Sequence, residues 1–239
     1  MKDLGAANHI LGMEIKQNKA KVKLWLNHRK YVKTILQRFN MQDNKPVKVP
    51  ILVDVKLSLE QCPKTQEEGE DMSRIPYASA VGSLMYAMVC IRPDIAHAVG
   101  VLSKFMSKPG KEHWTTVKWV FMYLHGTSDY GLCYQGRLGL DRVLDIRGFV
   151  DADWARDLDQ RRSTSGYVFN LFGGAVSWMS KKQSWHYKLQ GQNTWQPLMQ
   201  ARKQFGCRFC SSMGLVQGVI RIDCDNQSAI FLAKNPTYH

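Results

Sequence analysis

The sequence has little negative charge, no ordered cysteine pattern and no long apolar run. Its 20 Asp and Glu residues are outnumbered by 33 Lys and Arg residues, which gives a net charge of +13 at pH 7. The six cysteines lack the spacing of a disulfide framework, so we expect a reducing, intracellular setting. Cys207 and Cys210 form a lone C-x-x-C, which without a second pair is a weak signal for zinc or redox chemistry.

The longest apolar stretch, residues 78–91, is too short to cross a bilayer and predicts a buried helix. The first four residues are polar and no signal-peptide core follows them, so we expect no membrane association. The basic excess favours a polyanionic partner, with nucleic acid as the first candidate. A basic globular protein without such a partner is the alternative.

Hydrophobic periodicity indicates an α-rich first half and a β-rich second half, with a boundary near residue 126. In the first half we expect a hairpin of the segments 8–15 and 22–27, then an amphipathic helix over 28–40 and a surface connector over 41–72. Three further helices are expected, one over 76–90, one beginning at Pro93 and one over 112–125. Gly126 is expected at the C′ position after the last of them. In the second half we expect five strands, over 131–134, 143–150, 167–171, 175–179 and 219–222, followed by a short helix over 227–233.

Carboxylates follow two of these strands. Asp151 ends the run 143–150, and Asp225 follows the run 219–222. If the two strands are neighbours, both carboxylates meet at one sheet edge, where they could share Mg²⁺, a cation that prefers oxygen ligands. Two such ions can support phosphodiester cleavage. The alternative is a turn or cap, and Asp225 would suit the N-cap of the helix after it.

Several motifs around these carboxylates resemble those of copia-type retrotransposon Pol polyproteins. They are Asp151-Ala-Asp-Trp-Ala155, Arg161-Arg-Ser-Thr-Ser-Gly-Tyr167, Ser177-Trp-Met-Ser-Lys-Lys-Gln183 and Asp223-Cys-Asp-Asn-Gln-Ser-Ala229, with Tyr77-Ala-Ser-Ala-Val-Gly-Ser-Leu-Met-Tyr86, Arg92-Pro-Asp-Ile-Ala96 and Tyr123-Leu-His-Gly-Thr127 upstream. The resemblance covers nearly the whole chain except about 185–209. It implies an α/β (α+β) fold: a reverse-transcriptase tail and connection segment over 1–126, and an incomplete RNase H-like domain with a mixed sheet over 127–239.

The resemblance also implies which chemistry to expect. The family combines RNA-directed DNA polymerase with cleavage of the RNA strand of RNA–DNA hybrids using Mg²⁺. Its polymerase turn, Tyr-x-Asp-Asp, does not occur here. Of its four RNase H carboxylates, the first maps to Asp151 and the third to Asp225, whereas the fourth would lie beyond His239. The second, a Glu expected soon after Gln183, is missing, because residues 160–222 contain no Asp or Glu. Asp153 and Asp223 are expected to point to the opposite face and not to replace it.

The missing Glu has a readable cause. Gln192-Asn-Thr-Trp195 can be encoded by bases that give Ala-Glu-Tyr-Met in the neighbouring reading frame, which matches the family's helix. We infer a frameshifted window over 185–209. Its regularly spaced glutamines and Pro197 would disturb a core helix there, at a cost of about 3 kcal/mol for the proline.

These observations predict a decayed fragment of a Pol polyprotein that has lost ribonuclease activity. Two other functions stay open: a residual Mg²⁺-dependent nuclease that uses Asp151 and Asp225, and a non-catalytic basic module that binds nucleic acid. A third outcome is that no stable protein accumulates. The family resemblance implies an intracellular location, either cytoplasmic in virus-like particles or nuclear.

Overall fold

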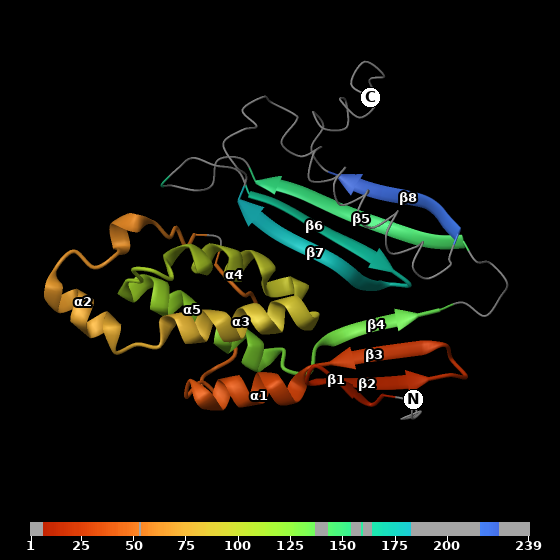
Figure 1. Cartoon of the computed structure of the whole chain (residues 1–239), viewed down its shortest axis with the longest axis horizontal. Coiled ribbons are helices and arrows are strands. Elements are labelled where there is room, and N and C mark those ends of the chain that lie inside the picture. The colour runs from red at the N-terminus through yellow and green to blue at the C-terminus, as the bar shows by residue number, and fades with distance from the viewer. Residues whose placement is uncertain are drawn as a thin grey trace, which may run out of the picture. The chain divides into compact units, whose positions relative to one another are not determined.

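The computed structural model describes residues 7–52, 54–136, 143–153, 159, 164–182 and 216–224. The chain forms two compact units, Met1–Cys133 and Tyr134–His239, which we call unit 1 and unit 2. The described residues contain five α-helices and two four-stranded sheets (Figure 1). The predicted α+β class is therefore confirmed. The predicted domains, 1–126 and 127–239, stay a prediction about the organisation of the polyprotein.

The first sheet and all five helices come from the first 135 residues. Three 3-10 turns (η) join them. The elements are β1 (His9–Ile10), β2 (Met13–Asn18), β3 (Lys23–Asn27), α1 (Arg29–Arg38), η1 (Leu59–Gln61), α2 (Gln66–Ser73), α3 (Tyr77–Ile91), η2 (Pro93–Ile95), α4 (Ala96–Leu102), η3 (Ser103–Phe105), α5 (Lys111–Gly126) and β4 (Gly131–Gln135). The predicted hairpin, amphipathic helix and three further helices are confirmed.

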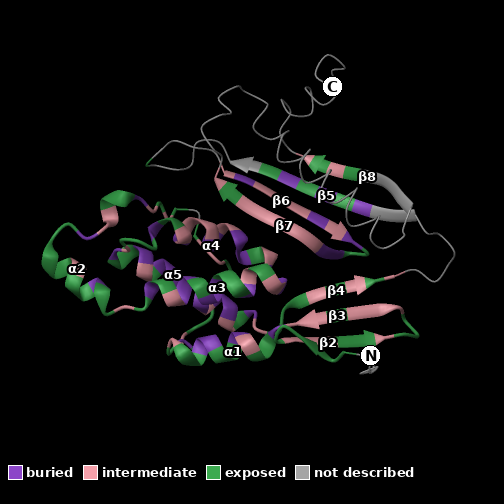
Figure 2. Ribbon diagram, viewed as in Figure 1, coloured by how far each residue is buried: buried purple, intermediate pink, exposed green. Residues whose placement is uncertain are grey.

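The core of unit 1 lies between α1, α3, α4 and α5 (Figure 2). Each helix contributes an apolar face, as Val32, Leu84, Val99 and Phe121 show, all at most 1% exposed. The apolar stretch 78–91 is helical as predicted, but only one face of α3 is buried, because Met85, Tyr86 and Val89 are exposed. Within the described residues no single helix is long and apolar enough to span a membrane, and only α2 and α3 together, bent by 50°, satisfy length and composition.

The predicted surface connector, 41–72, contains a helix that periodicity does not reveal. Helix α2 begins after Thr65, whose hydroxyl accepts a hydrogen bond from the Glu68 backbone N–H at 3.2 Å. The Glu68 carboxylate accepts from the backbone N–H of Thr65 in return. This reciprocal capping box satisfies donors at the start of the helix. The sequence signal Thr-x-x-Glu could have identified it.

Gly126 does not act as a C′ residue, so that prediction is wrong. It is the last residue of α5, and Thr127 follows it with a φ of −125°. The glycine is needed for space instead, because a Cβ there would lie 2.9 Å from the Cβ of Pro46. A β-carbon at position 126 would therefore push the 41–52 segment away from α5.

The strand at 131–134 belongs to the first sheet, whose order is β1-β2-β3-β4. We had expected it among the strands of the second half. Gly131 permits the close approach of β4 to β3, because a Cβ there would collide with the carbonyl oxygen of Leu26. A glycine inside a strand often marks such a close contact.

Unit 2 contains the second sheet, with order β7-β6-β5-β8. Its strands are β5 (Val143–Asp153), β6 (Thr164–Leu171), β7 (Gly174–Lys182) and β8 (Val216–Cys224). Strands β5, β6 and β7 pair antiparallel, and β8 pairs parallel to β5. The predicted mixed sheet and strand neighbours are confirmed. The predicted helix 227–233, the window 185–209 and the Cys207–Cys210 motif lie outside the described residues.

Candidate functional site

The candidate site is the sheet edge at which β5 and β8 end. The parallel register runs from Val143 opposite Val216 to Val150 opposite Cys224. The next residue of β5 is Asp151, which lies opposite Gly166 of β6 and is exposed. The residue after Cys224 is Asp225, which lies outside the described residues. The structure thus brings together the two strands that precede the predicted pair of carboxylates.

The pleat of β5 decides which side chains are available. Ile146, Gly148 and Val150 are buried, whereas Arg147, Phe149 and Asp151 are exposed. Successive side chains of a strand point to opposite faces, so Asp151 belongs to the exposed face of this sheet. Phe149, on the same face, is 40% exposed.

Asp223 also lies on this exposed face, because it is the register partner of Phe149. Our prediction that Asp223 points away from the site is therefore wrong. The error came from treating residues two apart along a strand as if their side chains pointed to opposite faces. Residues i and i+2 share a face.

The Asp223 carboxylate already forms an ion pair with the side chain of Arg147. The Nε of Arg147 donates to its Oδ2 at 2.8 Å, and the guanidinium lies 5.4 Å from the centroid of the Phe149 ring. Both partners are about half exposed, so this pair contributes little to stability. Its effect on the site is electrostatic, because the guanidinium neutralises the Asp223 carboxylate and competes with a metal cation for its oxygen atoms.

Among the described residues no group of three or more His, Cys, Asp or Glu side chains is arranged to hold a metal ion. Of the two predicted ligands, only Asp151 is described, and it makes an interaction with another group. The predicted Mg²⁺ site therefore stays a prediction. None of the four described cysteines is in a disulfide: Cys62, Cys90, Cys133 and Cys224.

Unit 1 contains a buried ionic network that the sequence pattern did not reveal. Arg92, only 2% exposed, donates from Nε and Nη2 to the carboxylate of Asp94 at 2.7–3.2 Å. It also donates to the carbonyl and hydroxyl oxygens of Thr127 at 3.0 and 2.6 Å. Tyr123 donates to Asp94 at 2.8 Å, and burial together with this hydrogen bond raises the pKa of Tyr123 to about 12. The network ties η2 to the end of α5.

A second cluster, formed around the buried side chain of His28, joins the β2–β3 hairpin to the helices. His28 is 1% exposed and stacks on Tyr31 with ring centroids 4.6 Å apart, and Tyr86 lies against both rings. Tyr86 donates to the carbonyl of Leu11 at 2.9 Å. Burial lowers the pKa of His28 below its ordinary value of 6.5. The imidazole is therefore held in its neutral form at neutral pH.

The fold and the motifs define a segment of a transposon polyprotein. The chain is 49% identical, over its full length, to the retrovirus-related Pol polyprotein from transposon TNT 1-94 of Nicotiana tabacum. It is 34% identical over its full length to the Pol polyprotein from transposon RE1 of Arabidopsis thaliana. An uncharacterised mitochondrial protein of Arabidopsis thaliana is 32% identical over 77% of the chain, which covers 70% of that protein. The chain belongs to the family of retrovirus-related Pol polyproteins from copia-type transposons.

The chain spans only a small part of its larger relatives, 18% of the TNT 1-94 polyprotein and 16% of the RE1 polyprotein. No family model matches the chain. No solved structure matches it either. The activities of the whole polyproteins are therefore proposals for these 239 residues.

Proposed function

We propose that the chain is the reverse-transcriptase tail, connection and RNase H-like portion of a copia-type Pol polyprotein, and that it binds nucleic acid without cleaving it. The observation that carries this proposal is the β5–β8 edge. Two strands that precede Asp151 and Asp225 pair in parallel up to the residues just before these carboxylates. This is the strand arrangement that the RNase H resemblance implies.

Catalysis requires more ligands than these residues offer. Two-metal hydrolysis needs two cations held about 3.5–4 Å apart, which several carboxylates must fix. Residues 160–222 contain no Asp or Glu, and Asp223 is paired with Arg147. The described residues therefore do not fit a two-Mg²⁺ centre, and we propose no step through one. The absence of a Tyr-x-Asp-Asp turn supports a lack of polymerase activity in these residues.

Nucleic-acid binding is supported by the net charge of +13. Lysine and arginine contacts with phosphates release counterions, so binding of this kind weakens steeply as salt rises. Residual nuclease activity is the second candidate, favoured by the exposed position of Asp151 at the sheet edge. We further propose an intracellular setting, cytoplasmic or nuclear, which the reduced state of the four described cysteines supports.

The test is a cleavage assay on a labelled RNA–DNA hybrid with Mg²⁺ and with Mn²⁺. We expect no cleavage above the background of an Asp151→Asn variant purified in parallel. A matched variant restores residues 185–209 to the family reading frame and extends the chain beyond His239, and this variant should cleave. Cleavage by the unrepaired chain that disappears in Asp151→Asn would establish the residual nuclease instead.

A salt titration of hybrid binding tests the second half of the proposal. We expect binding at low salt, with an affinity that falls linearly with salt on logarithmic axes. Absence of binding at low salt, or an affinity indifferent to salt, would contradict it.

A further inference from the structure

The β2–β3 hairpin carries an unusual concentration of positive charge. From residue 15 to residue 42 the sequence has eight Lys and Arg residues and no Asp or Glu. Four of these residues, Lys16, Lys19, Lys21 and Lys23, lie in the hairpin and its turn. The hairpin extends beyond α1 within unit 1 (Figure 1). Half of this positive charge is therefore carried on one hairpin and its turn.

The strand register places a tryptophan among these lysines. Trp25 lies directly opposite Lys16, and Lys23 lies opposite Asn18. Directly opposed residues share a face of an antiparallel pair, as do residues two apart along a strand. Lys16, Lys23 and Trp25 therefore occupy one face, which we call the hairpin face. Trp25 is 36% exposed, Lys16 is exposed and Lys23 is half-buried.

The turn between the strands has a defined conformation. The Asn18 side chain accepts from the Lys21 backbone N–H at 3.0 Å, and the Val22 N–H donates to the Lys19 carbonyl at 3.3 Å. Val22 adopts a φ of +48°. Lys19 and Lys21, both exposed, are thus held at the tip beside the hairpin face.

The lysines of the hairpin are available for an external partner. Within the described part of the chain, none of the four forms an ion pair, and Glu14, which shares the hairpin face two residues before Lys16, is paired with Lys30 at 3.4 Å. The face therefore combines uncompensated positive charge with an accessible indole ring. Cationic grooves that present an aromatic ring match a strand with free bases, because phosphates contact the lysines and a base stacks on the ring.

We propose that the hairpin face is a binding site for single-stranded nucleic acid, with Trp25 stacking on a base and Lys16, Lys19, Lys21 and Lys23 contacting phosphates. This inference rests on the proposed nucleic-acid binding and adds the site and the form of the ligand. A duplex hides its base faces, so it can use the lysines but not the indole. An anionic membrane could use both groups, and the experiment separates these partners.

The experiment measures binding of the full chain to fluorescein-labelled oligo(dT) by anisotropy over a range of salt concentrations. An abasic strand of the same length, a duplex and phosphatidylserine vesicles are the comparison ligands. Trp25→Ala should weaken binding to oligo(dT) about tenfold, the scale of one lost stacking contact, and leave binding to the abasic strand unchanged. Trp25→Phe should restore most of the affinity. Phe172→Ala, which removes an aromatic ring 43% exposed on another hairpin, is the matched control and should have no effect.

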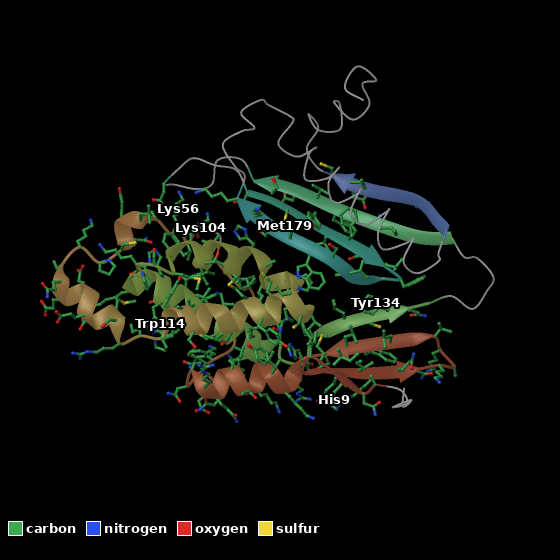
Figure 3. The ribbon with its side chains drawn as sticks, viewed as in Figure 1. His9, Lys56, Lys104, Trp114, Tyr134 and Met179 are labelled. Carbon is green, nitrogen blue, oxygen red and sulfur yellow. The ribbon has the colours of Figure 1, made fainter. Side chains whose placement is uncertain are left out.

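The charge variant replaces the four hairpin lysines with Gln. It should lower the slope of log affinity against log salt by about three, because each phosphate contact on a single strand contributes about 0.7. The matched control changes the four exposed lysines Lys45, Lys48, Lys56 and Lys64 to Gln, with the same loss of charge (Figure 3 labels Lys56). It should lower the slope by less than one. Circular dichroism establishes that each variant is folded.

The outcomes separate the two proposals. If the wild-type chain binds no nucleic acid at low salt, both the proposed function and this site are wrong. If it binds but the hairpin and control lysine variants lower the salt slope equally, only the proposed site is wrong. The same conclusion follows if Trp25→Ala weakens binding to oligo(dT) and to the abasic strand by the same factor. Tighter Trp25-dependent binding to vesicles than to oligo(dT) would overturn the choice of partner.

Discussion

Unit 1 and the described sheet of unit 2 bury their apolar side chains in different ways. In unit 1, four helices surround one continuous core in which residues such as Leu84 and Phe121 are fully buried. In unit 2, Ile146 and Phe169 are buried on one face of the sheet, while Phe149 on the other is 40% exposed. No helix occurs among the described residues of unit 2.

The motifs that reveal the family resemblance and the most fully buried core that the structure describes lie in different units. The motifs that identify the RNase H resemblance lie in unit 2, on strands that need cover on both faces to form a closed core. Unit 1 has fewer motifs that suggest chemistry but has the complete core and the buried Arg92 network. The recognisable motifs of unit 2 therefore lie on a sheet of which one face is exposed among the described residues.

The largest expected effect comes from the unit 1 core. Phe121→Ala should lower the free energy of unfolding by about 3–5 kcal/mol, because it removes a fully buried ring that stacks on Phe39 with centroids 5.1 Å apart. Phe149→Ala, at an exposed position, should cost less than about 1 kcal/mol. Urea denaturation followed by circular dichroism measures both. Equal losses would remove the contrast between the units.

The Arg92 network should give the next largest effect. Arg92→Met should cost about 3 kcal/mol, because it leaves Asp94 and Thr127 without their buried donor. Arg38→Met is the control, since Arg38 is exposed and, among the described residues, its guanidinium contacts only the Ser79 hydroxyl and the Phe39 ring, and it should cost less than about 1 kcal/mol. Hydrogen exchange should show the loss in α4 and α5. A loss confined to other regions would contradict this assignment.

A glycine pair tests packing in unit 2. Gly148→Ala should cost about 1–3 kcal/mol, because the new Cβ would lie 2.6 Å from the buried ring of Phe169. Gly166→Ala places its Cβ at an ordinary 3.6 Å from the Met179 carbonyl and should leave stability unchanged or slightly raised. The readout is hydrogen exchange in β5 and β6. Tolerance of Gly148→Ala would show that this face is loosely packed.

The smallest expected effect depends on pH. Burial depresses the pKa of His28 in the folded protein, so the unfolded chain binds more protons once the pH falls below about 6.5. Stability is therefore fully present above that pH and decreases as the pH falls toward the folded pKa. His28→Phe, which keeps a ring beside Tyr31, should reduce the difference in thermal midpoint between pH 8 and pH 5. An unchanged difference would assign the pH dependence to other histidines.

Local patterns were sufficient for much of this fold. The alternation at 143–150 predicted β5, and helical spacing at 28–40 predicted α1. Contacts between distant segments were harder to predict, because the residues of a strand do not identify the strand with which it pairs. The strand 131–134 pairs with β3, about a hundred residues earlier, and Gly126 is explained by the distant Pro46.

The candidate site was only partly accessible from the sequence. Strand ends and motifs located Asp151 and predicted the neighbouring strand, and the β5–β8 register confirms that strand pairing. The Arg147–Asp223 pair was missed, since the two residues are 76 positions apart and only the register brings them together. The hairpin face was missed because the net charge of the whole chain does not show where the excess Lys and Arg residues lie.

The parallel pairing of β8 with β5 has a consequence for chain connectivity. Val143 and Val216 pair although about seventy residues separate them, whereas β5, β6 and β7 follow one another closely. Forming the pair closes a long loop, and the entropic cost of closure grows only with the logarithm of loop length, by about 0.6 kcal/mol for each doubling. Insertions and deletions of a few residues in the connection should therefore change the free energy of forming the β5–β8 pair only slightly. In folding, the β5–β7 meander can form early from local contacts, and the distant strand is added afterwards.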